Sequence, residues 1–391
     1  GMGLGVTRFH CIAFLTWQCM NFFGASNIFP IFSNLVPQWK CGDAGVFGKD
    51  CTEYTRCKGN VTFAPAAFNS TVLEFRWICN DSYSAAFSSQ AQFFGYFSGT
   101  VTFGFASDLL GRKWVSTAAV MLGLLATIAS GLLQSAAMII AARFCIGLSI
   151  GGMMVVGCTY IMELILPQQR MFLRAYFNWG ISRILLTTIA YVTQEWRAAA
   201  FGIALVASPA LIAVLFIFPE SPTWLHSKGR LDKMRTSERR IARIAGVEYV
   251  PVHHPRLEKS KSFIELMRSG VMRRLLVLWV MWFTAATSSF ATDLISNEIS
   301  GNLYVNQLLF GAVLYASKIA LGIADARVPA LTRRLLHQGS QAGAIFCFTM
   351  LAIFSVVKYT GPFFLVFNII GICFVEYTWD TCYVCAVESM E

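Results

Sequence analysis

The sequence predicts an all-α membrane protein, because it is strongly apolar and contains ten apolar stretches of membrane-spanning length. Of its 391 residues, 56% are hydrophobic and 13% are charged, whereas about 25% are charged in soluble domains. A spanning helix needs about 20 mostly apolar residues. Such stretches occur at residues 10–32, 85–106, 114–134, 137–162, 172–192, 198–218, 274–294, 303–324, 341–357 and 362–386. A soluble core does not account for ten of them.

Positive charge gives these helices an orientation. Thirteen of the 31 Lys and Arg residues lie between Lys228 and Arg274, and others follow the second and eighth stretches at Arg112, Lys113, Arg327, Arg333 and Arg334. If the spans alternate, all these loops lie on one side, which the positive-inside rule assigns to the cytoplasm. The N-terminus and residue 391 are then cytoplasmic, and we expect a plasma-membrane protein. The net charge of +10 reflects this topology, and no nucleic-acid partner is expected.

A large loop at residues 33–84 is expected on the extracellular side. It carries three Asn-x-Ser/Thr sequons, at Asn60, Asn69 and Asn80, and sequons are glycosylated only in the secretory lumen. Four cysteines of this loop can form two disulfides in three alternative pairings, and they are Cys41, Cys51, Cys57 and Cys79. The other eight cysteines are interpreted as apolar packing residues of the helices.

The order of spans divides the chain into three parts. Six spans fill an N-terminal bundle at 1–218, a basic cytoplasmic segment follows at 219–273, and four spans form 274–391. Helix-forming residues at Leu231–Ala245 predict a short helix in the basic segment. The basic run within that helix is expected to be a solvated face near lipid headgroups.

Weak internal repeats relate the two halves. The segment Gly104-Phe-Ala-Ser-Asp108-Leu-Leu-Gly111-Arg112-Lys113 follows the second span, and Gly322-Ile-Ala-Asp325 with Arg333 and Arg334 follows the eighth. Glu163, Pro167 and Arg170 follow the fourth span, and Glu388 follows the tenth. Parallel repeats of six spans are the construction of major facilitator transporters.

Further motifs occur at matching places along the chain. Asn27 stands ten residues before Pro37 and fourteen before Cys41, and Trp77-Ile-Cys79-Asn precedes the second span. The fourth span contains Arg143-Phe-x2-Gly147-x3-Gly151-Gly152, and Pro219-Glu220-Ser221-Pro222-Thr-Trp224-Leu225 follows the sixth. Gly301-Asn302-Leu-Tyr304-Val-Asn306 opens the eighth. Together these motifs resemble the organic cation and anion transporter family of the major facilitator superfamily over essentially the whole chain.

The resemblance implies a major facilitator fold, with a six-helix N-terminal bundle and an incomplete C-terminal bundle that makes ten of an expected twelve spans. It also implies secondary active or facilitative transport of small organic ions by alternating access. The expected partners are an organic anion or cation as substrate, a coupling ion or exchange anion, and the lipid bilayer. Two alternatives stay open. A sugar-porter-like carrier shares the Pro-Glu-Ser-Pro-type loop and the Gly-Arg-Lys signature, although the Cys-bearing outer loop and the seventh span oppose it. A truncated or degenerate relative that does not transport is suggested by the two missing spans.

The loops after the second, fourth, sixth and eighth spans are expected to control conformation. Ionic contacts between the halves would favour one side-open state, and the alternative is that these charges only set topology. The sequence departs from the family at Leu109, where an arginine is common, and lacks a glycine before Arg333. The residues expected to act in gating are Asp108, Gly111, Arg112, Lys113, Glu163, Arg170, Glu220, Arg333 and Arg334.

Ionisable side chains within the spans are candidates for substrate binding, because a charge at membrane depth is costly and persists mainly beside a cavity or a partner. They are Arg143, Arg183, Lys318, Glu376 and Asp380. Lys318 follows Phe310-Gly-Ala-Val at the spacing of a cavity lysine in the anion branch of the resembling family. Glu376 and Asp380 lie one helical turn apart, and the cation branch can place an acidic residue at the second position. Organic anions are therefore favoured slightly over cations.

Packing alternatives exist for the same residues. Arg183 or Lys318 could pair with Glu376 or Asp380 without any substrate role, and Arg143 could bind backbone carbonyls near the extracellular end. Four further substrate-binding candidates come from the resemblance, and they are Asn27, Trp282, Phe283 and Phe290. Aromatic rings in the seventh span would stack on planar organic ions, and the alternative is that they pack against neighbours.

Nothing in the sequence indicates an enzyme. The histidines at 10, 226, 253, 254 and 337 stand at helix ends or in the cytoplasmic segment without metal-site spacing. No glycine-rich phosphate loop ending in Lys-Ser/Thr occurs, so ATP-driven transport has no support. No cofactor and no metal are expected.

Overall fold

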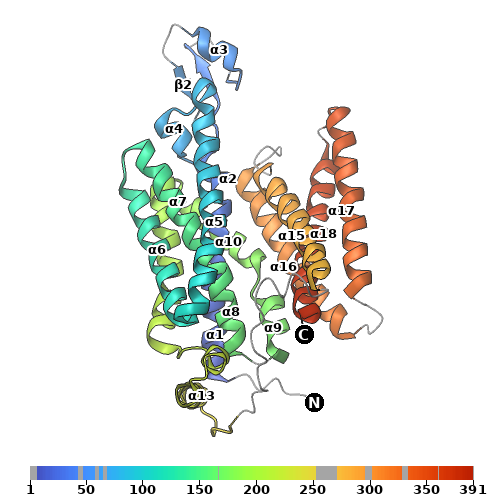
Figure 1. Ribbon diagram of the computed structural model, residues 1–391. Helices are drawn as coiled ribbons and strands as arrows, with labels where there is room; N and C mark the ends of the chain where they lie inside the picture. Colours follow the sequence, from blue (N-terminus) through green and yellow to red (C-terminus); the bar gives the residue numbers. More distant parts are fainter. Residues whose placement is uncertain are drawn as a thin grey trace. The chain divides into compact units, whose positions relative to one another are not determined.

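The computed structural model describes residues 7–42, 47–57, 61–64, 68–165, 167–251, 271–295, 302–327, 333–359 and 361–390. Helices form at each of the ten apolar stretches, as Figure 1 shows. Six of the helices in these ranges are both long and apolar enough to cross a membrane. The prediction of an all-α membrane protein is therefore confirmed.

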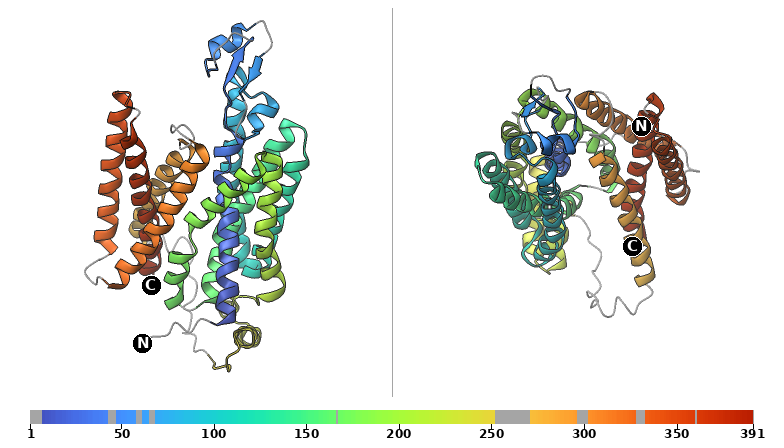
Figure 2. Two further views of the ribbon diagram at one scale, coloured as in Figure 1. Left: turned by 180° about the vertical axis from the view of Figure 1, so that it is seen from behind. Right: turned by 90° about the horizontal axis from the view of Figure 1, so that it is seen from above.

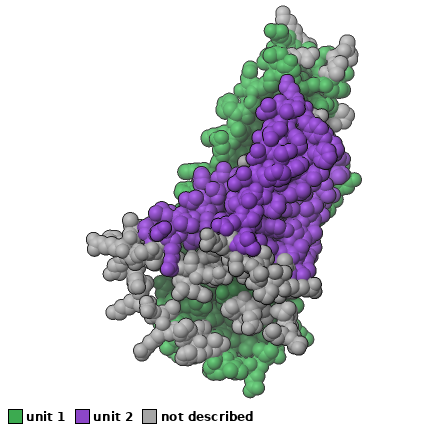
Figure 3. Space-filling view, turned by 90° about the vertical axis from the view of Figure 1, so that its right-hand side faces the viewer, with its two compact units in different colours: residues 1–170, 182–252 green, residues 171–181, 253–391 purple. Residues whose placement is uncertain are grey.

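Two compact units make up the chain. Unit 1 comprises residues 1–170 and 182–252, and unit 2 comprises residues 171–181 and 253–391 (Figure 3). Met171–Ile181, which lies in the N-terminal half of the sequence, belongs to unit 2. Gly180 shows why, because a Cβ there would lie 2.7 Å from the carbonyl oxygen of Gly311 in the same unit.

Unit 1 is built from the helices of the first six apolar stretches. Helix α1 runs the length of the bundle (Figure 2). The elements are α1 (Arg8–Ala25), η1 (Ser26–Ile28), α2 (Pro30–Ser33), α5 (Ser82–Leu110), α6 (Arg112–Leu132), α7 (Ala136–Gly152), η3 (Met153–Gly157), α8 (Cys158–Leu164), α9 (Pro167–Tyr176), α10 (Trp179–Thr193), α11 (Trp196–Ile212) and η4 (Ala213–Ile217), of which α9 and α10 each continue into unit 2.

Glycines hold α5 and α7 in very close contact. Gly95 and Gly99 on α5 face Gly147 and Gly151 on α7, and a Cβ at any of the four would overlap backbone atoms of the facing helix. Small residues four apart are the usual means by which membrane helices approach so closely. The glycines of the Arg143-Phe-x2-Gly147-x3-Gly151 motif are thus packing residues.

The predicted fifth span, residues 172–192, is interrupted. It forms two helices, α9 and α10, separated at Phe177 and Asn178. The Asn178 side chain accepts a hydrogen bond from Gly180 N at 2.9 Å and donates one to the Ala175 carbonyl at 2.9 Å. Asparagine competes for backbone groups in this way at helix ends, which explains why an apolar stretch of spanning length is not one helix.

The 33–84 loop, predicted to be extracellular, folds into a small disulfide-linked substructure. Strands β1 (Trp39–Cys41) and β2 (Val61–Phe63) pair antiparallel, with Trp39 opposite Phe63. The helical elements are α3 (Cys51–Arg56), α4 (Thr71–Phe75) and η2 (Cys79–Asp81). The buried side chains of Trp39, Val72, Trp77 and Ile78 form its core.

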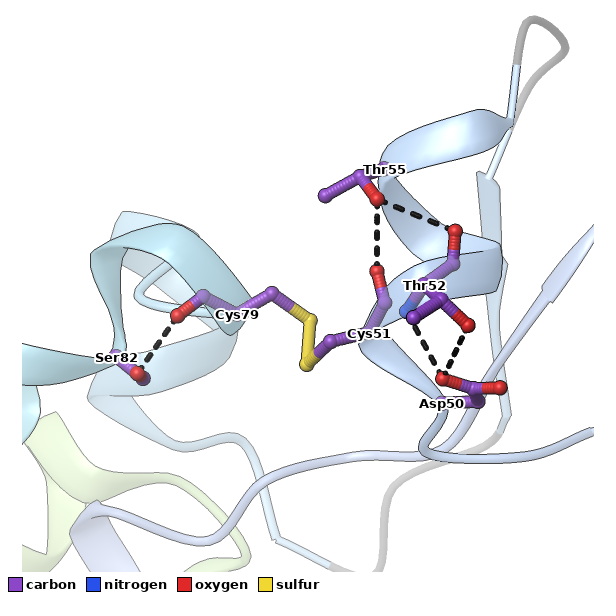
Figure 4. Close-up of a disulfide and its surroundings, with 6 residues drawn as sticks. All are labelled: Asp50, Cys51, Thr52, Thr55, Cys79 and Ser82. Atoms are coloured by element: carbon purple, nitrogen blue, oxygen red, sulfur yellow. Dashed lines mark hydrogen bonds between the residues drawn. A yellow bond between two sulfur atoms is a disulfide. The ribbon is translucent and has the colours of Figure 1, made fainter.

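The disulfides join Cys41 to Cys57 and Cys51 to Cys79, with Cα–Cα distances of 5.7 and 5.4 Å. The sequence had left three pairings open. Figure 4 shows the second bond tying α3 to η2, directly before α5. Asp50 caps α3 by accepting from Thr52 N at 2.9 Å, and the Ser82 hydroxyl donates to the Cys79 carbonyl at 2.7 Å.

Two helices of unit 1 belong to the basic segment. These are α12 (Pro222–Ser227) and α13 (Leu231–Ala245), and α13 has the bounds predicted for it. Gly246 ends α13 in a left-handed conformation with φ of 73°, the usual role of a glycine after a helix. Leu225 and Met234 pack α12 and α13 together.

Unit 2 contains the four helices of the C-terminal stretches, α15 (Val271–Ile295), α16 (Leu303–Arg327), α17 (Arg333–Val356) and α18 (Pro362–Met390). Phe310 and Leu314 of α16 are buried against Ile372 of α18. This contact places the polar residues further along both helices side by side.

Candidate functional site

A polar cluster forms at the end of unit 1 where α5 turns into α6, the end predicted to be cytoplasmic. Gly111 makes the turn with φ of 111° and ψ of 157°, a conformation that only glycine adopts readily. Helix α5 ends at Leu110 and α6 begins at Arg112. The glycine thereby places Asp108 and Arg112 on either side of a sharp bend.

Arg112 joins the two helices to α8. Its Nη1 lies 2.7 Å from Asp108 Oδ1 and donates to Ser107 Oγ at 2.6 Å, and its Nε lies 3.5 Å from Glu163 Oε1. Asp108 is 66% exposed, whereas Arg112 and Glu163 are 17% and 16% exposed. The inner Arg112–Glu163 contact is therefore better shielded from water than the outer one. Ser221 donates its hydroxyl proton to the other oxygen of Glu163.

Glu220 connects this cluster to the segment after the sixth span. Its Oε1 accepts hydrogen bonds from Lys113 N at 2.9 Å and from Ser221 N at 3.0 Å. Lys113 Nζ donates to the Phe218 carbonyl at 2.8 Å, and Trp224 Nε1 donates to the Asp108 carbonyl at 3.1 Å. Two sequence motifs more than a hundred residues apart thus form one network, and every contact just described lies inside unit 1.

Sequence reasoning missed two members of this network. Ser221 caps α12 by accepting from Trp224 N at 3.1 Å while it bonds Glu163, and Tyr160 donates its hydroxyl proton to the Pro219 carbonyl. Ser221 could have been found, because a serine before Pro222 is a helix N-cap signal. Tyr160 carries no local signal.

Arg170 makes a separate contact within unit 1. Arg170 Nε donates to the Met162 carbonyl at 3.1 Å, which ties α9 to the end of α8. Arg333 and Arg334 begin α17, but their side chains lie outside the described residues.

A buried ion pair lies in unit 2. Lys318 Nζ on α16 is 3.1 Å from Glu376 Oε2 on α18 and donates to the Glu376 carbonyl at 3.2 Å. The two side chains are 8% and 11% exposed. One of the pairings considered from the sequence is thus present. The side chain of Asp380, one turn beyond Glu376, lies outside the described residues.

The two predicted arginines of unit 1 are both buried. Arg183 on α10 is 1% exposed and Arg143 on α7 is 5% exposed. Arg143 Nη2 donates to Ser33 Oγ at 2.7 Å, a side-chain hydroxyl rather than the backbone carbonyl considered as the packing alternative. Asn27 is 1% exposed in η1, and its Oδ1 accepts from Gln92 Nε2 at 3.2 Å.

The aromatic candidates lie on α15 of unit 2. Trp282 packs edge-on against Trp379 of α18 with a centroid separation of 5.0 Å. Phe283 is 71% exposed. The side chain of Phe290 lies outside the described part of the chain.

Two of the three sequon asparagines can be placed. Asn69 and Asn80 are both exposed, and Asn60 lies outside the described residues. Backbone hydrogen bonds of 2.8 Å to Gln194 and 3.1 Å from Trp196 fix Asn69 beside the α10–α11 turn.

A second contact anchors the 33–84 loop to the bundle. Glu74 on α4 accepts from Trp196 Nε1 at 2.7 Å and from Arg197 Nη2 at 2.6 Å. Burial raises the pKa of the Glu74 carboxyl, but the hydrogen bonds from Arg197 and Trp196 outweigh it, so the pKa lies below its ordinary value. The carboxylate form therefore holds α4 against the start of α11.

The described residues contain no group of three or more His, Cys, Asp or Glu side chains that could hold a metal ion. The network of unit 1 and the ion pair of unit 2 are charge and hydrogen-bond arrangements.

Comparison with known families identifies the family of this chain. A family model described as "Sugar (and other) transporter" matches residues 58–391. The chain belongs to this transporter family. It is a major facilitator transporter, either of the solute carrier 22 type or sugar-porter-like, and the major facilitator fold predicted from its motifs is confirmed.

Relatives of this transporter include organic ion carriers. An uncharacterized protein of Caenorhabditis elegans is 34% identical over 98% of this chain and 81% of its own. Solute carrier family 22 member 16 of Homo sapiens is 26% identical over 63% of this chain, and member 7 of Mus musculus is 24% identical over 85%. The transporter spans 45% of the human relative and 63% of the mouse relative. The resemblance to organic ion transporters is therefore confirmed.

Solved structures agree on the fold. The xylose transporter XylE from E. coli, in a partially occluded inward-open conformation, superimposes with a TM-score of 0.64 at 13% identity over 98% of this chain and 87% of its own. The human organic anion transporter MFSD10 (TETRAN) gives a TM-score of 0.57 at 14% identity over 97% and 85%.

Proposed function

We propose that this transporter moves small organic ions across the plasma membrane by alternating access, with organic anions favoured over cations, and with both the N-terminus and residue 391 in the cytoplasm. The observation that carries the proposal is the buried Lys318–Glu376 pair of unit 2. Charges at membrane depth are costly and persist chiefly where they serve an ion pathway or a substrate. Uniport, exchange and coupling to a second ion are all compatible with such a pair.

The names of relatives support an organic ion without choosing its sign. One relative is an "Organic cation transporter-like protein" of Drosophila melanogaster at 24% identity, and one structural neighbour is an organic anion transporter. The charges of this chain favour the anion. Three of the five ionisable candidates within the spans are basic, and two are acidic, so together they carry a net positive charge that an anionic substrate would offset.

An anionic substrate would act on the pair by competition. Lys318 is held by Glu376 while no substrate is bound, and an incoming carboxylate can replace Glu376 beside the ammonium group. The substrate charge then substitutes for a protein charge, so the lysine is never left buried and unpaired. A cationic substrate would instead replace Lys318 and bind the Glu376 carboxylate. Trp282, Phe283 and Phe290 on α15 would add stacking contacts for a planar ion.

The cytoplasmic network of unit 1 would set the balance between conformations. Arg112, Glu163 and Glu220 hold the ends of α5, α6 and α8 to the segment before α12. Breaking these contacts would favour whichever state does not need them. Arg333 and Arg334 are proposed to play the corresponding part in the second half.

Reconstituted protein in liposomes tests the proposal. Uptake of labelled organic anions and cations should be saturable with or without an ion gradient. Glu376→Gln should lower the KM for anions, because it removes the competing carboxylate, and should weaken cation uptake. Lys318→Ala should weaken anion uptake far more than cation uptake, whereas Lys318→Arg should retain anion uptake. Equal loss of both would remove the preference for anions.

A neutral double variant separates transport from packing. Replacing both partners of a buried ion pair by apolar residues is often neutral for stability, so Lys318→Met with Glu376→Leu should fold and should lose ion uptake. Normal uptake by this variant would show that the pair is only a packing contact. Uptake of a labelled sugar but of no organic ion would favour the sugar-porter-like alternative.

A further inference from the structure

We propose that unit 1 contains a binding site for a small inorganic anion, with chloride as the obvious occupant, in a pocket beside Arg143. The pocket lies inside the bundle, between η1, α5, α6, α7 and α11. Its polar lining consists of Ser26, Gln92, Thr127, Ser130 and Arg143, and the remainder is apolar. This site goes beyond the proposed transport of organic ions, and it does not depend on the sign of the substrate.

The charge of Arg143 is the first reason for the proposal. Arg143 is 5% exposed, and its guanidinium donates to the Ser33 hydroxyl at 2.7 Å. A guanidinium has five N–H donors, and within the described ranges this is the single hydrogen bond that it makes, with no carboxylate paired to it. Burying an unpaired charge is strongly unfavourable. An anion in the pocket would supply the missing negative charge.

Thr127 gives a second, independent reason. Its hydroxyl is buried, lines the same pocket and has no hydrogen-bond partner among the described residues. The neighbouring Ser130 hydroxyl is already committed, because it donates to the Thr127 carbonyl at 2.7 Å. A hydroxyl can turn its proton toward an anion. Thr127 and Arg143 therefore offer donors to one space from two different helices.

The other polar side chains that line the pocket donate to protein acceptors, as Ser26 does to the Phe23 carbonyl at 2.6 Å. Gln92 Nε2 donates to the Ser26 carbonyl at 3.3 Å and to Asn27 Oδ1 at 3.2 Å. Trp196 directs its indole N–H away to Glu74, at 2.7 Å. Among the groups that line the pocket, the donors that remain for a ligand are those of Arg143 and Thr127. A site with donors alone suits a ligand that only accepts hydrogen bonds, such as a halide ion.

The size of the pocket selects the ligand. It has room for about two water molecules, which suits a monatomic halide better than an organic acid. The apolar walls favour an anion that gives up its hydration shell readily. We therefore expect this site and the Lys318–Glu376 pair to bind different ligands.

Equilibrium binding of ³⁶Cl⁻ to the purified full chain tests the site, with gluconate replacing chloride at constant ionic strength. We expect saturable binding near one ion per chain, displaced by bromide and not by benzoate. Arg143→Gln should abolish it. Thr127→Val should weaken it about tenfold or more, because a hydrogen bond to a charged group is lost.

Thr117→Val is the matched control. Thr117 lies on the same helix and is similarly buried, but its hydroxyl already donates to the Lys113 carbonyl at 2.8 Å. This variant should bind ³⁶Cl⁻ as the wild type does. If Arg143→Gln does not fold, the comparison of Thr127→Val with Thr117→Val decides the matter. Absence of saturable binding in the wild type would mean that water fills the pocket, and binding unchanged in Thr127→Val would place the anion elsewhere; either result overturns the proposal.

Chloride should also raise the melting temperature of the wild type relative to gluconate, because a ligand that binds only the folded state stabilises it. The chloride effect should be smaller in Thr127→Val and unchanged in Thr117→Val. An equal effect in all three proteins would show that the stabilisation does not come from this pocket.

Discussion

Gly111→Ala is expected to destabilise unit 1 by two separable effects. The first is backbone strain, because Gly111 has φ of 111° and ψ of 157°, a region essentially restricted to glycine that costs about 1–3 kcal/mol for other residues. The second is a collision, because a Cβ there would lie 2.5 Å from Glu220 Oε2. Moving Glu220 weakens its hydrogen bonds from Lys113 N and Ser221 N.

Each of those bonds has a charged acceptor and contributes about 1.5–3 kcal/mol. With one of them lost, the total expected for Gly111→Ala is about 2.5–6 kcal/mol. Gly246→Ala is the matched control, since Gly246 also has a positive φ, of 73°, but no atom lies within 4 Å of its added Cβ. Its cost should be about 1–2 kcal/mol, from backbone strain alone.

Guanidinium unfolding of the purified protein in detergent, followed by tryptophan fluorescence, measures both variants. A double-mutant cycle with Glu220→Ala isolates the collision. In that background Gly111→Ala should cost only the backbone strain. The reasoning is refuted if Gly111→Ala costs no more than Gly246→Ala, or if its cost is the same with and without the Glu220 side chain.

Three further predictions concern residues of the 33–84 loop. Glu74→Gln should reduce the loss of stability that the wild type shows below about pH 4.5. Because the pKa of Glu74 is lowered in the fold, its bond to Arg197 stabilises the fold above the ordinary pKa, and this stabilisation is lost as the pH falls through the lowered pKa. Melting temperatures measured from about pH 6 to pH 3 check this, and an equal fall of melting temperature with pH in wild type and variant would contradict it. Cys51→Ala with Cys79→Ala should lower the free energy of unfolding by about 3 kcal/mol through loss of a bond that spans 28 residues, and peptide mapping without reductant should recover this pairing from the wild type. Asn69→Gln should remove one glycan from protein made in a secretory host, seen as a mass difference that disappears after enzymatic deglycosylation. The melting temperature of the deglycosylated protein should not change, because Asn69 is bonded to the bundle through its backbone.

Features that depend on local sequence were predicted well. Apolar runs of spanning length became helices, and α13 has its predicted bounds because helical spacing and a following glycine define it locally. The fifth stretch was predicted as one span because hydropathy does not register a side chain that competes for backbone hydrogen bonds. Asn178 interrupts it in that way.

For features that depend on partners distant in sequence, the sequence predicted which residues take part but not how they pair. Four cysteines were expected to form two bonds, and the fold of β1, β2 and α3 selected the pairing. Several basic and acidic residues could have paired in the spans, and the packing of α16 on α18 selected Lys318 with Glu376. Tyr160 was missed, because its contact to the Pro219 carbonyl has no local sequence signal.

The sequence by itself determined that this is a helical membrane protein of the major facilitator type, because hydrophobic length, charge asymmetry and short motifs are properties of neighbouring residues. Only the tertiary structure decided which charges are neutralised. It gave Lys318 a carboxylate at 3.1 Å and left Arg143 with a serine hydroxyl. The physical reason is that the cost of a buried charge depends on what surrounds it, and those surroundings come from helices far apart in the chain.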